Sequence, residues 1–139
     1  MSTSKNKANV RRLIEEAYVK NNFSVLSELL APDYVYHDAT GGIKGPEGMK
    51  QSVMVYRKAF PDMHVKLGQL VAESDMVAGP ITYGGTFKGE LMGIAPTGKK
   101  FEISALVLSR HGKDGRQVEA WPFMDMLSFY QQLGIKPPG

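Results

Sequence analysis

The hydrophobic residues in the first 60 positions recur every three or four residues, which is the period of an amphipathic helix. This pattern predicts a first helix over residues 5–20 and a shorter second helix that ends before Pro32. A third helix is predicted over residues 45–60, because Pro46 stands in its first turn, where proline fits a helix. Residues 34–37, between the second and third helices, have the composition of a short strand.

After residue 62 the pattern changes to runs of strand-forming residues separated by short turns. The expected strands cover residues 63–72, 76–88, 99–110 and 116–123. Consecutive strands joined by tight turns form an antiparallel meander. The predicted class is therefore α+β, with an antiparallel sheet packed against three N-terminal helices and a short C-terminal helix. Gly79-Pro80 and Gly84-Gly85 predict bulges or bends, so we expect a strongly curved sheet.

The size and composition of the chain fit one soluble globular domain. Its 139 residues are 42% hydrophobic and 22% charged, and we expect a single domain over residues 1–139 with a flexible N-terminus at residues 1–4. Both alternating sets of side chains in residues 99–110 include apolar ones, so both faces of the sheet are expected to be covered. Helices would cover one face, and a second copy of the chain the other, giving a homodimer through the sheet.

Charge and chemistry exclude several classes of function. The basic residues behind the formal net charge of +3 are dispersed, so no nucleic-acid partner is expected. The chain has no cysteine, and its three histidines share no ligand-like spacing, so neither thiolate catalysis nor a metal site is expected. No run of about 18 apolar residues is present to span a membrane. The first residues lack the apolar core of a secretory signal, and we expect a cytoplasmic protein.

Asp125 is the strongest catalytic candidate, because it lies at an apolar strand-to-helix junction. The four residues before it are Trp121-Pro122-Phe123-Met124, and burial among such side chains raises the pKa of a carboxyl group toward the range of a general base. Aspartate is also a preferred N-cap, and residues 126–133 have the pattern of a short helix. Both roles stay open for Asp125 from its position alone.

An ordered set of short motifs resembles the SnoaL-like polyketide cyclases, or ester cyclases, of the nuclear transport factor 2-like superfamily. The motifs are Leu30-Ala31-Pro32-Asp33-Tyr34-Val35-Tyr36-His37-Asp38, Gly45-Pro46-Glu47-Gly48, Phe60-Pro61-Asp62, the glycine-rich segment 89–100, and Gln131-Gln132-Leu133-Gly134. The resemblance covers nearly the whole chain. It implies a cone-shaped fold in which the curved sheet encloses a pocket for a small apolar or aromatic ligand.

The resemblance also implies a reaction. Enzymes of this family close a ring in a polyketide ester by intramolecular aldol condensation, without a metal or an organic cofactor. Their general acid/base is an aspartate nine residues before the glycine of the terminal Gln-Leu-Gly, which corresponds to Asp125 here. Two family histidines correspond to Phe87 and Val107, so the pocket would offer fewer hydrogen-bond donors to an enolate oxygen than in established cyclases.

Further pocket residues are expected among the aromatic side chains, although core packing is the alternative for most of them. The expected lining residues are Tyr18, Tyr56, Phe60, Tyr83, Phe87, Val107, Trp121 and Phe123. If Phe87 points inward, strand alternation places Tyr83 and Ile81 on the same side. His37 could orient a substrate carbonyl or relay a proton, and the alternative is a hydrogen-bonded histidine at the pocket rim without such a role. His64 and His111 are expected to be solvated, and Asp38 to form a turn.

Three functions remain open from the sequence. The first is a cofactor-independent cyclase-type enzyme with Asp125 as acid/base, and an isomerase, dehydratase or epoxide hydrolase would use a similar carboxylate. The second is a non-catalytic protein that binds a small hydrophobic ligand, which the absence of both imidazoles favours. The third is a dimerisation scaffold, which requires the cavity to be filled by side chains.

Overall fold

The computed structural model describes residues 2–38 and 41–137. Its helical elements are α1 (Thr3–Arg12), the π-helix η1 (Leu13–Val19), the 3₁₀-helix η2 (Phe23–Val25), α2 (Leu26–Leu29), α3 (Gly45–Ala59) and α4 (Met126–Leu133). Its strands are β1 (Leu30–Tyr36), β2 (Ile43–Lys44), β3 (His64–Leu67), β4 (Val71–Glu73), β5 (Met76–Thr86), β6 (Lys100–His111) and β7 (Gln117–Met124). Within the described ranges, no helix is both long enough and apolar enough to cross a membrane.

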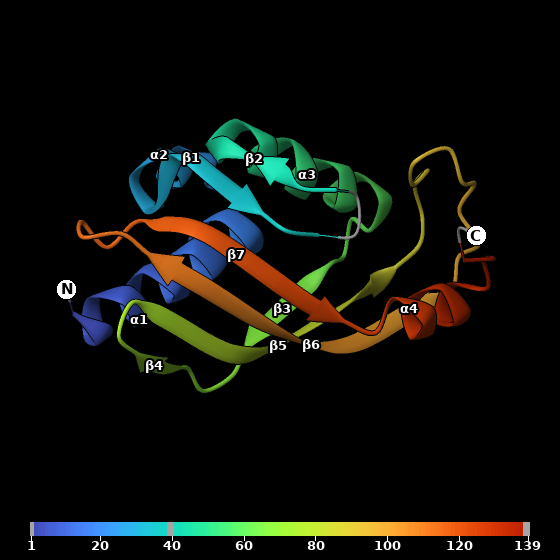
Figure 1. Ribbon diagram of the computed structural model, residues 1–139. Helices are drawn as coiled ribbons and strands as arrows, with labels where there is room; N and C mark the ends of the chain where they lie inside the picture. Colours follow the sequence, from blue (N-terminus) through green and yellow to red (C-terminus); the bar gives the residue numbers. More distant parts are fainter. Residues whose placement is uncertain (1, 39–40, 138–139) are drawn as a thin grey trace.

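The strands form one sheet in the order β2-β1-β7-β6-β5-β3, with β4 also paired to β5. The predicted antiparallel meander is present as β5, β6 and β7, which are the long central strands in Figure 1. In contrast, β1 pairs with β7 in parallel, so the sheet is mixed. The α+β class with helices packed against a curved sheet is confirmed, and the parallel pair is a feature that the short turns of the meander did not predict.

The first predicted helix is a single helical segment whose second half is a π-helix, formed by α1 and η1. Thr3 and Ser4 already belong to α1, and the side chain of Ser2 caps it by accepting a hydrogen bond from the amide of Lys5. Residues 1–4 were expected to form a flexible N-terminus. Met1 lies outside the described residues. The third predicted helix is confirmed as α3, with proline in its first turn.

The second predicted helix is shorter than expected, because β1 already begins at Leu30 and includes Pro32. Proline has no amide hydrogen to donate to a neighbouring strand. The pairing of β1 with β7 shifts register between Leu30 and Val35, which accommodates Pro32 in an irregular part of the ladder.

The glycines of β5 serve close packing rather than bulges. β5 pairs with β6 without a register shift from Met76 to Thr86, so of the bulges or bends predicted at Gly79-Pro80 and Gly84-Gly85, the bulges are not found. A Cβ atom on Gly84 would lie 2.3 Å from Nε2 of His64, and one on Gly79 would lie 2.4 Å from a methyl carbon of Leu70. At Gly79 the backbone carbonyl of Gln69 would also lie 3.1 Å away, so glycine is needed there, whereas at Gly84 only the far end of the His64 side chain would have to move.

The core lies between the inner face of the sheet and the helices. At the α4 end it is filled by four rings, Phe60, Phe87, Phe101 and Phe129, which we call the phenylalanine cluster. Phe60 contacts the other three rings with centroid separations of 4.9 to 5.9 Å. Such tilted and edge-to-face contacts fill space without leaving polar atoms unpaired.

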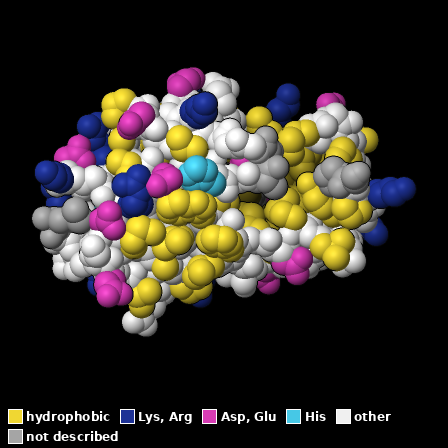
Figure 2. All heavy atoms as spheres, viewed as in Figure 1, with side chains coloured by type: hydrophobic (Ala, Val, Ile, Leu, Met, Phe, Trp, Pro, Cys, Tyr) yellow, Lys and Arg dark blue, Asp and Glu magenta, His cyan; other side chains and the backbone are white. Residues whose placement is uncertain are grey.

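The opposite face of the sheet is apolar and exposed. Leu106 of β6 and Phe123 of β7 are paired neighbours that remain 46% and 56% exposed. Figure 2 shows apolar side chains gathered over the central strands on this face. We call the residues Pro80, Leu106, Leu108, Trp121 and Phe123 the outer patch. One face of the sheet is thus covered by helices, as predicted, and the other carries this patch.

Candidate functional site

The interior of the fold contains a half-enclosed cavity of about 30 Å³. It is lined by Val10, Ile14, Tyr18, Tyr34, Tyr36, Tyr83, Val107, Leu108, Ser109, Gln117 and Ala120. A water molecule needs roughly 10 to 15 Å³ of such space, so the cavity has room for about two waters. Pockets that enclose a drug-sized ligand measure about 300 to 1,000 Å³, so a whole polyketide does not fit in this conformation.

Four phenol rings, Tyr18, Tyr34, Tyr36 and Tyr83, form most of the polar wall, and we call them the tyrosine quartet. Tyr34 and Tyr36 share one face of β1 because side chains on a strand alternate. Tyr18 comes from the π-helix η1, a type of turn that is frequent at functional sites. Tyr83 comes from the inner face of β5, the same side as the fully buried Ile81 and Phe87, as the alternation predicted.

Burial keeps the tyrosine quartet protonated. Desolvation raises the pKa of all four phenols well above their usual value of 10, and for Tyr34, Tyr36 and Tyr83 the neighbouring phenols add to that rise. Among the described residues, none of the four hydroxyl groups has a hydrogen-bond partner. None of these four oxygens is among the fully buried unpaired side-chain atoms of the described residues, so each reaches space in which water or an oxygen atom of a ligand could pair with it.

Ser109 and His111 extend the polar wall along β6. The Ser109 Oγ atom lies 2.8 Å from Nε2 of His111, and Nδ1 of His111 lies 2.9 Å from the carbonyl oxygen of Gly115. A carbonyl only accepts, so the ring proton is on Nδ1 and Ser109 donates its proton to Nε2. His111 is only 1% exposed, so the prediction that it is solvated was wrong. Burial lowers the pKa of His111 and keeps the imidazole neutral.

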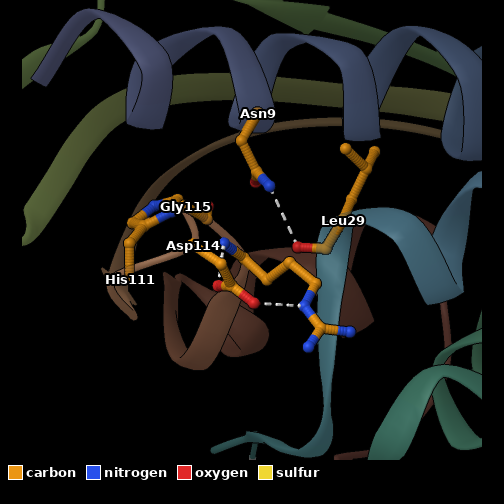
Figure 3. Close-up of polar contacts among 6 residues, drawn as sticks. Asn9, Leu29, His111, Asp114 and Gly115 are labelled. Atoms are coloured by element: carbon orange, nitrogen blue, oxygen red, sulfur yellow. Dashed lines mark hydrogen bonds and ion pairs between the residues drawn. The ribbon is translucent and has the colours of Figure 1, made fainter. Parts of the chain in front are cut away.

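A second buried polar pair connects the same region to the helices. Gln117 of β7 donates a hydrogen bond to the side-chain oxygen of Asn9, 3.1 Å away. Asn9 in turn donates to the carbonyl oxygen of Leu29, 3.0 Å away, as Figure 3 shows. This relay satisfies the last carbonyl of α2, which would otherwise be buried without a partner. It ties α1, the end of α2 and β7 together behind the cavity.

Asp125 lies outside this cavity. Its side chain is exposed, and its Oδ1 atom accepts a hydrogen bond from the amide of Ser128, 3.0 Å away. The cap interpretation of Asp125 is therefore confirmed, because this is the N-cap contact of α4. The burial predicted for Asp125 is not found, since the apolar residues before it in sequence do not enclose the carboxylate.

His37 and Trp121 lie on the outer side of the sheet. Their rings stack with centroids 5.2 Å apart, and the Nε2 atom of His37 lies 2.8 Å from a carboxylate oxygen of Glu119. Hydrogen bonds from His37 and then from Arg110 lower the pKa of Glu119. The structure places neither His37 nor Trp121 among the residues that line the cavity.

The remaining predicted residues divide between the cavity and the core. Val107 lines the cavity, whereas Phe60 and Phe87 belong to the fully buried phenylalanine cluster. Tyr56 is half-buried on α3, where burial, then Tyr130 and Asp38, raise its pKa. Asp38 accepts a hydrogen bond from the amide of Gly42, as expected of a turn former. Phe123 is exposed in the outer patch.

Sequence reasoning identified Tyr18, Tyr83 and Val107 as cavity residues and missed others. Tyr34 and Tyr36 were read only as a strand signal, although their spacing of two already places them on one face. Ser109 follows Val107 by two residues on the same strand, so the same alternation could have identified it. For Gln117, at the first position of β7, the sequence carried no comparable signal.

Comparison with known proteins supports the fold and the lineage. The family model described as SnoaL-like polyketide cyclase matches residues 8–133, which is most of the chain. The chain belongs to the SnoaL-like polyketide cyclase family. No curated protein matches it.

Several solved structures share this architecture over nearly their full length. Wild-type IdmH, a candidate polyketide cyclase from Streptomyces antibioticus, is 34% identical, with coverage of 94% of this chain and 99% of IdmH and a TM-score of 0.77. AclR, a candidate hydroxylase from Streptomyces galilaeus, is 28% identical, with coverage of 98% and 100% and a TM-score of 0.81. A candidate SnoaL-like cyclase from Jannaschia sp. CCS1 shares the fold at 21% identity, coverage of 97% and 95%, and a TM-score of 0.86.

Proposed function

We propose that this SnoaL-like protein is a cofactor-independent enzyme that closes a ring in a small, apolar, carbonyl-bearing molecule by intramolecular aldol chemistry. The observation that carries the proposal is the family match over residues 8–133, supported by the 34% identity to IdmH, a candidate polyketide cyclase. The substrate of this chain would be a polyketide-like ester whose C–H bonds are acidified by neighbouring carbonyl groups. Such bonds need only a well-placed base.

Asp125 is the proposed general acid/base. It would remove a proton from the activated carbon and later return it to the oxygen formed in ring closure. Its Oδ1 atom is held by the amide of Ser128, and the exposed carboxylate remains accessible to a ligand lying across the N-terminus of α4. The substrate would therefore be held near α4, apart from the inner cavity, whose lining includes no residue of α4.

The decisive experiment separates the catalytic role of Asp125 from its cap. In Asp125→Asn the amide oxygen still accepts from Ser128, because asparagine caps helices as well as aspartate does. We expect turnover of an aromatic polyketide ester, found by screening esters and lactones, to fall by about 10² to 10⁴-fold with little change in melting temperature. The matched control is Asp114→Asn, an exposed aspartate that binds Arg116 in the β6–β7 turn, which should leave turnover unchanged. Equal turnover of wild type and Asp125→Asn would contradict the assignment.

A non-catalytic alternative is favoured by one observation, the small size of the cavity. This alternative is a dimerisation scaffold, which requires that side chains fill the cavity. The cavity of about 30 Å³ is too small to hold a whole ligand, as this alternative expects. This alternative predicts that no member of an aromatic ester and lactone series raises the melting temperature of the wild-type protein. A ligand-dependent rise in melting temperature would exclude the scaffold reading, because only a ligand that binds the folded state stabilises it.

We also propose that two copies of the chain associate through the outer patch. The patch is contiguous across β5, β6 and β7, and its border carries Arg110 beside Glu119, one charge of each sign. A twofold axis would bring each of these charges toward its opposite on the second copy, which makes the surface self-complementary. Phe123→Glu should convert the dimer to a monomer in sedimentation velocity, whereas Met54→Glu, at an exposed apolar residue of α3, should not. A wild-type monomer at micromolar concentration would rule out this dimer.

A further inference from the structure

We propose that Ser109 is a nucleophile activated by His111, and that the inner cavity hydrolyses esters of small acyl groups. This activity would be separate from the proposed cyclisation and does not involve Asp125. Ser109 lines the cavity and is 6% exposed, and His111 stands behind it on the same face of β6. Nothing in the family match assigns a role to either residue.

The hydrogen bonds around His111 have the order that nucleophilic catalysis requires. The nucleophile must donate to a base, and the base must be oriented by a third group. Here Ser109 Oγ lies 2.8 Å from the unprotonated Nε2 atom, and Nδ1–H donates to the carbonyl oxygen of Gly115 over 2.9 Å. The Gly115 carbonyl holds the tautomer and the ring plane, a role that a carboxylate performs in serine hydrolases.

The orienting carbonyl is itself fixed by the turn between β6 and β7. Gly115 has a φ of 87°, which a residue with a side chain adopts only under strain, and a Cβ atom there would lie 3.0 Å from the Lys5 side chain. Its amide donates to the carbonyl oxygen of Gly112, and the amide of His111 donates to that of Asp75. His111 and Gly115 lie side by side in Figure 3, at the start and near the end of this turn. The imidazole therefore has little freedom to rotate.

The cavity that Ser109 lines also offers donors for the developing negative charge. The tyrosine quartet lines the same cavity as Ser109, and the raised pKa values of its phenols keep their protons in place. In acyl transfer, donors of this kind stabilise the oxyanion of the tetrahedral intermediate. Nucleophile, base, orienting group and oxyanion donors therefore lie together in one part of the fold.

The proposed ester hydrolysis needs water as its only co-reactant. Ser109 Oγ attacks the acyl carbon while its proton passes to Nε2 of His111. The tetrahedral intermediate then breaks the bond to the leaving alcohol or phenol, which takes that proton. Water attacks the acyl-Ser109 ester in the same manner, gives its proton to Nε2, and releases the carboxylic acid with the serine regenerated. With room for about two waters, the cavity accepts an acyl group about as large as acetyl.

The test uses 4-nitrophenyl acetate and the full chain. We expect peptide mapping by mass spectrometry to find an acetyl group on Ser109 shortly after mixing, together with release of 4-nitrophenolate. Ser109→Ala should abolish acetylation of that peptide. The matched control is Ser104→Ala on the same strand, because Ser104 is exposed and faces away from the cavity. The Ser104→Ala variant should be acetylated at Ser109 as fast as the wild-type protein.

A second variant separates catalysis by His111 from its structural role. In His111→Asn the amide nitrogen occupies the place of Nδ1, so it can still donate to Gly115, but no atom remains to take the serine proton. Acetylation of Ser109 should slow by at least about a hundredfold in a variant that is still folded at the assay temperature. Acetyl groups confined to lysine or tyrosine in the wild-type protein would overturn the proposal, whatever the stability of the variants. Equal rates at Ser109 in wild type and a folded His111→Asn would also overturn it.

Discussion

The two ends of the protein interior are built from four aromatic rings each, yet only one end is solid. The phenylalanine cluster packs its rings at centroid distances of 4.9 to 5.9 Å. The tyrosine quartet is less completely buried, since Tyr36 is only partly buried, and it surrounds a cavity of about 30 Å³. The chemical difference is one hydroxyl group per ring, which needs a partner and therefore keeps space open. The first end contributes stability, and the second is the end suited to bind oxygen atoms.

The largest expected effect comes from breaking the solid end. Phe60→Ala would remove a ring that is 0% exposed and contacts three other rings. We expect the free energy of unfolding in urea to fall by about 3 to 5 kcal/mol, because the cavity left behind cannot close completely. Phe123→Ala, at a 56% exposed ring, is the control and should change it by less than about 1 kcal/mol in the monomer. Equal losses at both positions would show that the cluster is not the stabilising end.

An intermediate effect is expected from acidifying the polar end. Burial lowers the pKa of His111 below its usual value of 6.5, so below that pH the unfolded chain binds a proton that the folded chain does not. Stability should therefore be complete above pH 6.5 and decline as the pH falls through this range. Asp62, Asp114 and Glu119 have lowered pKa values, so their contributions are lost only at lower pH, below their usual values of 3.8 and 4.5.

The His111→Asn variant isolates this contribution. Urea unfolding between pH 7 and the carboxylate range should show a decline for the wild type and a flatter profile for the variant, because asparagine does not titrate. Parallel profiles would mean that another group causes the decline.

The smallest change in the free energy of unfolding is expected from Tyr83→Phe, which removes one hydroxyl group from the cavity wall and leaves a phenyl ring like those of the phenylalanine cluster. Because the Tyr83 hydroxyl has no partner among the described residues, its loss should change the free energy of unfolding by less than about 1 kcal/mol. The same variant should weaken the binding of any ligand whose oxygen atom pairs with the Tyr83 hydroxyl. A ligand titration should show a loss of about 1 kcal/mol in binding free energy per lost hydrogen bond. A large loss of stability would show that the hydroxyl is paired within the fold.

The sequence predicted the regular parts of the fold because their signals are local. Pro46 marks the start of α3, and the strand alternation of Ile81, Tyr83 and Phe87 places all three inside. The aspartate at position 125 was recognised both as a cap and as a candidate base, and its contact with Ser128 depends only on residues nearby in sequence. Features of this kind follow from periodicity and capping rules.

The cavity was harder to predict because it depends on contacts between distant segments. His111 was expected in solvent beside a turn, but a register shift after Arg110 and the carbonyl of Gly115 turn it into the interior. His37 and Trp121 were expected in the pocket, whereas the pairing of β1 with β7 places their rings together on the outer face. The face of a short strand that packs against the core depends on its register with the neighbouring strands, and that register cannot be predicted from the sequence of the strand alone.

The parallel pairing of β1 with β7 also has a consequence for how the protein is made. Tyr36 lies beside Ala120, so the strand that carries two tyrosines of the quartet has no partner on that side until most of the chain has left the ribosome. Pairing of segments so far apart in sequence is slow, because loop closure must precede the contacts that reward it. The nascent chain would therefore carry a β1 that can pair with β2 but not yet with β7, and the cavity would be the last part of the molecule to take shape.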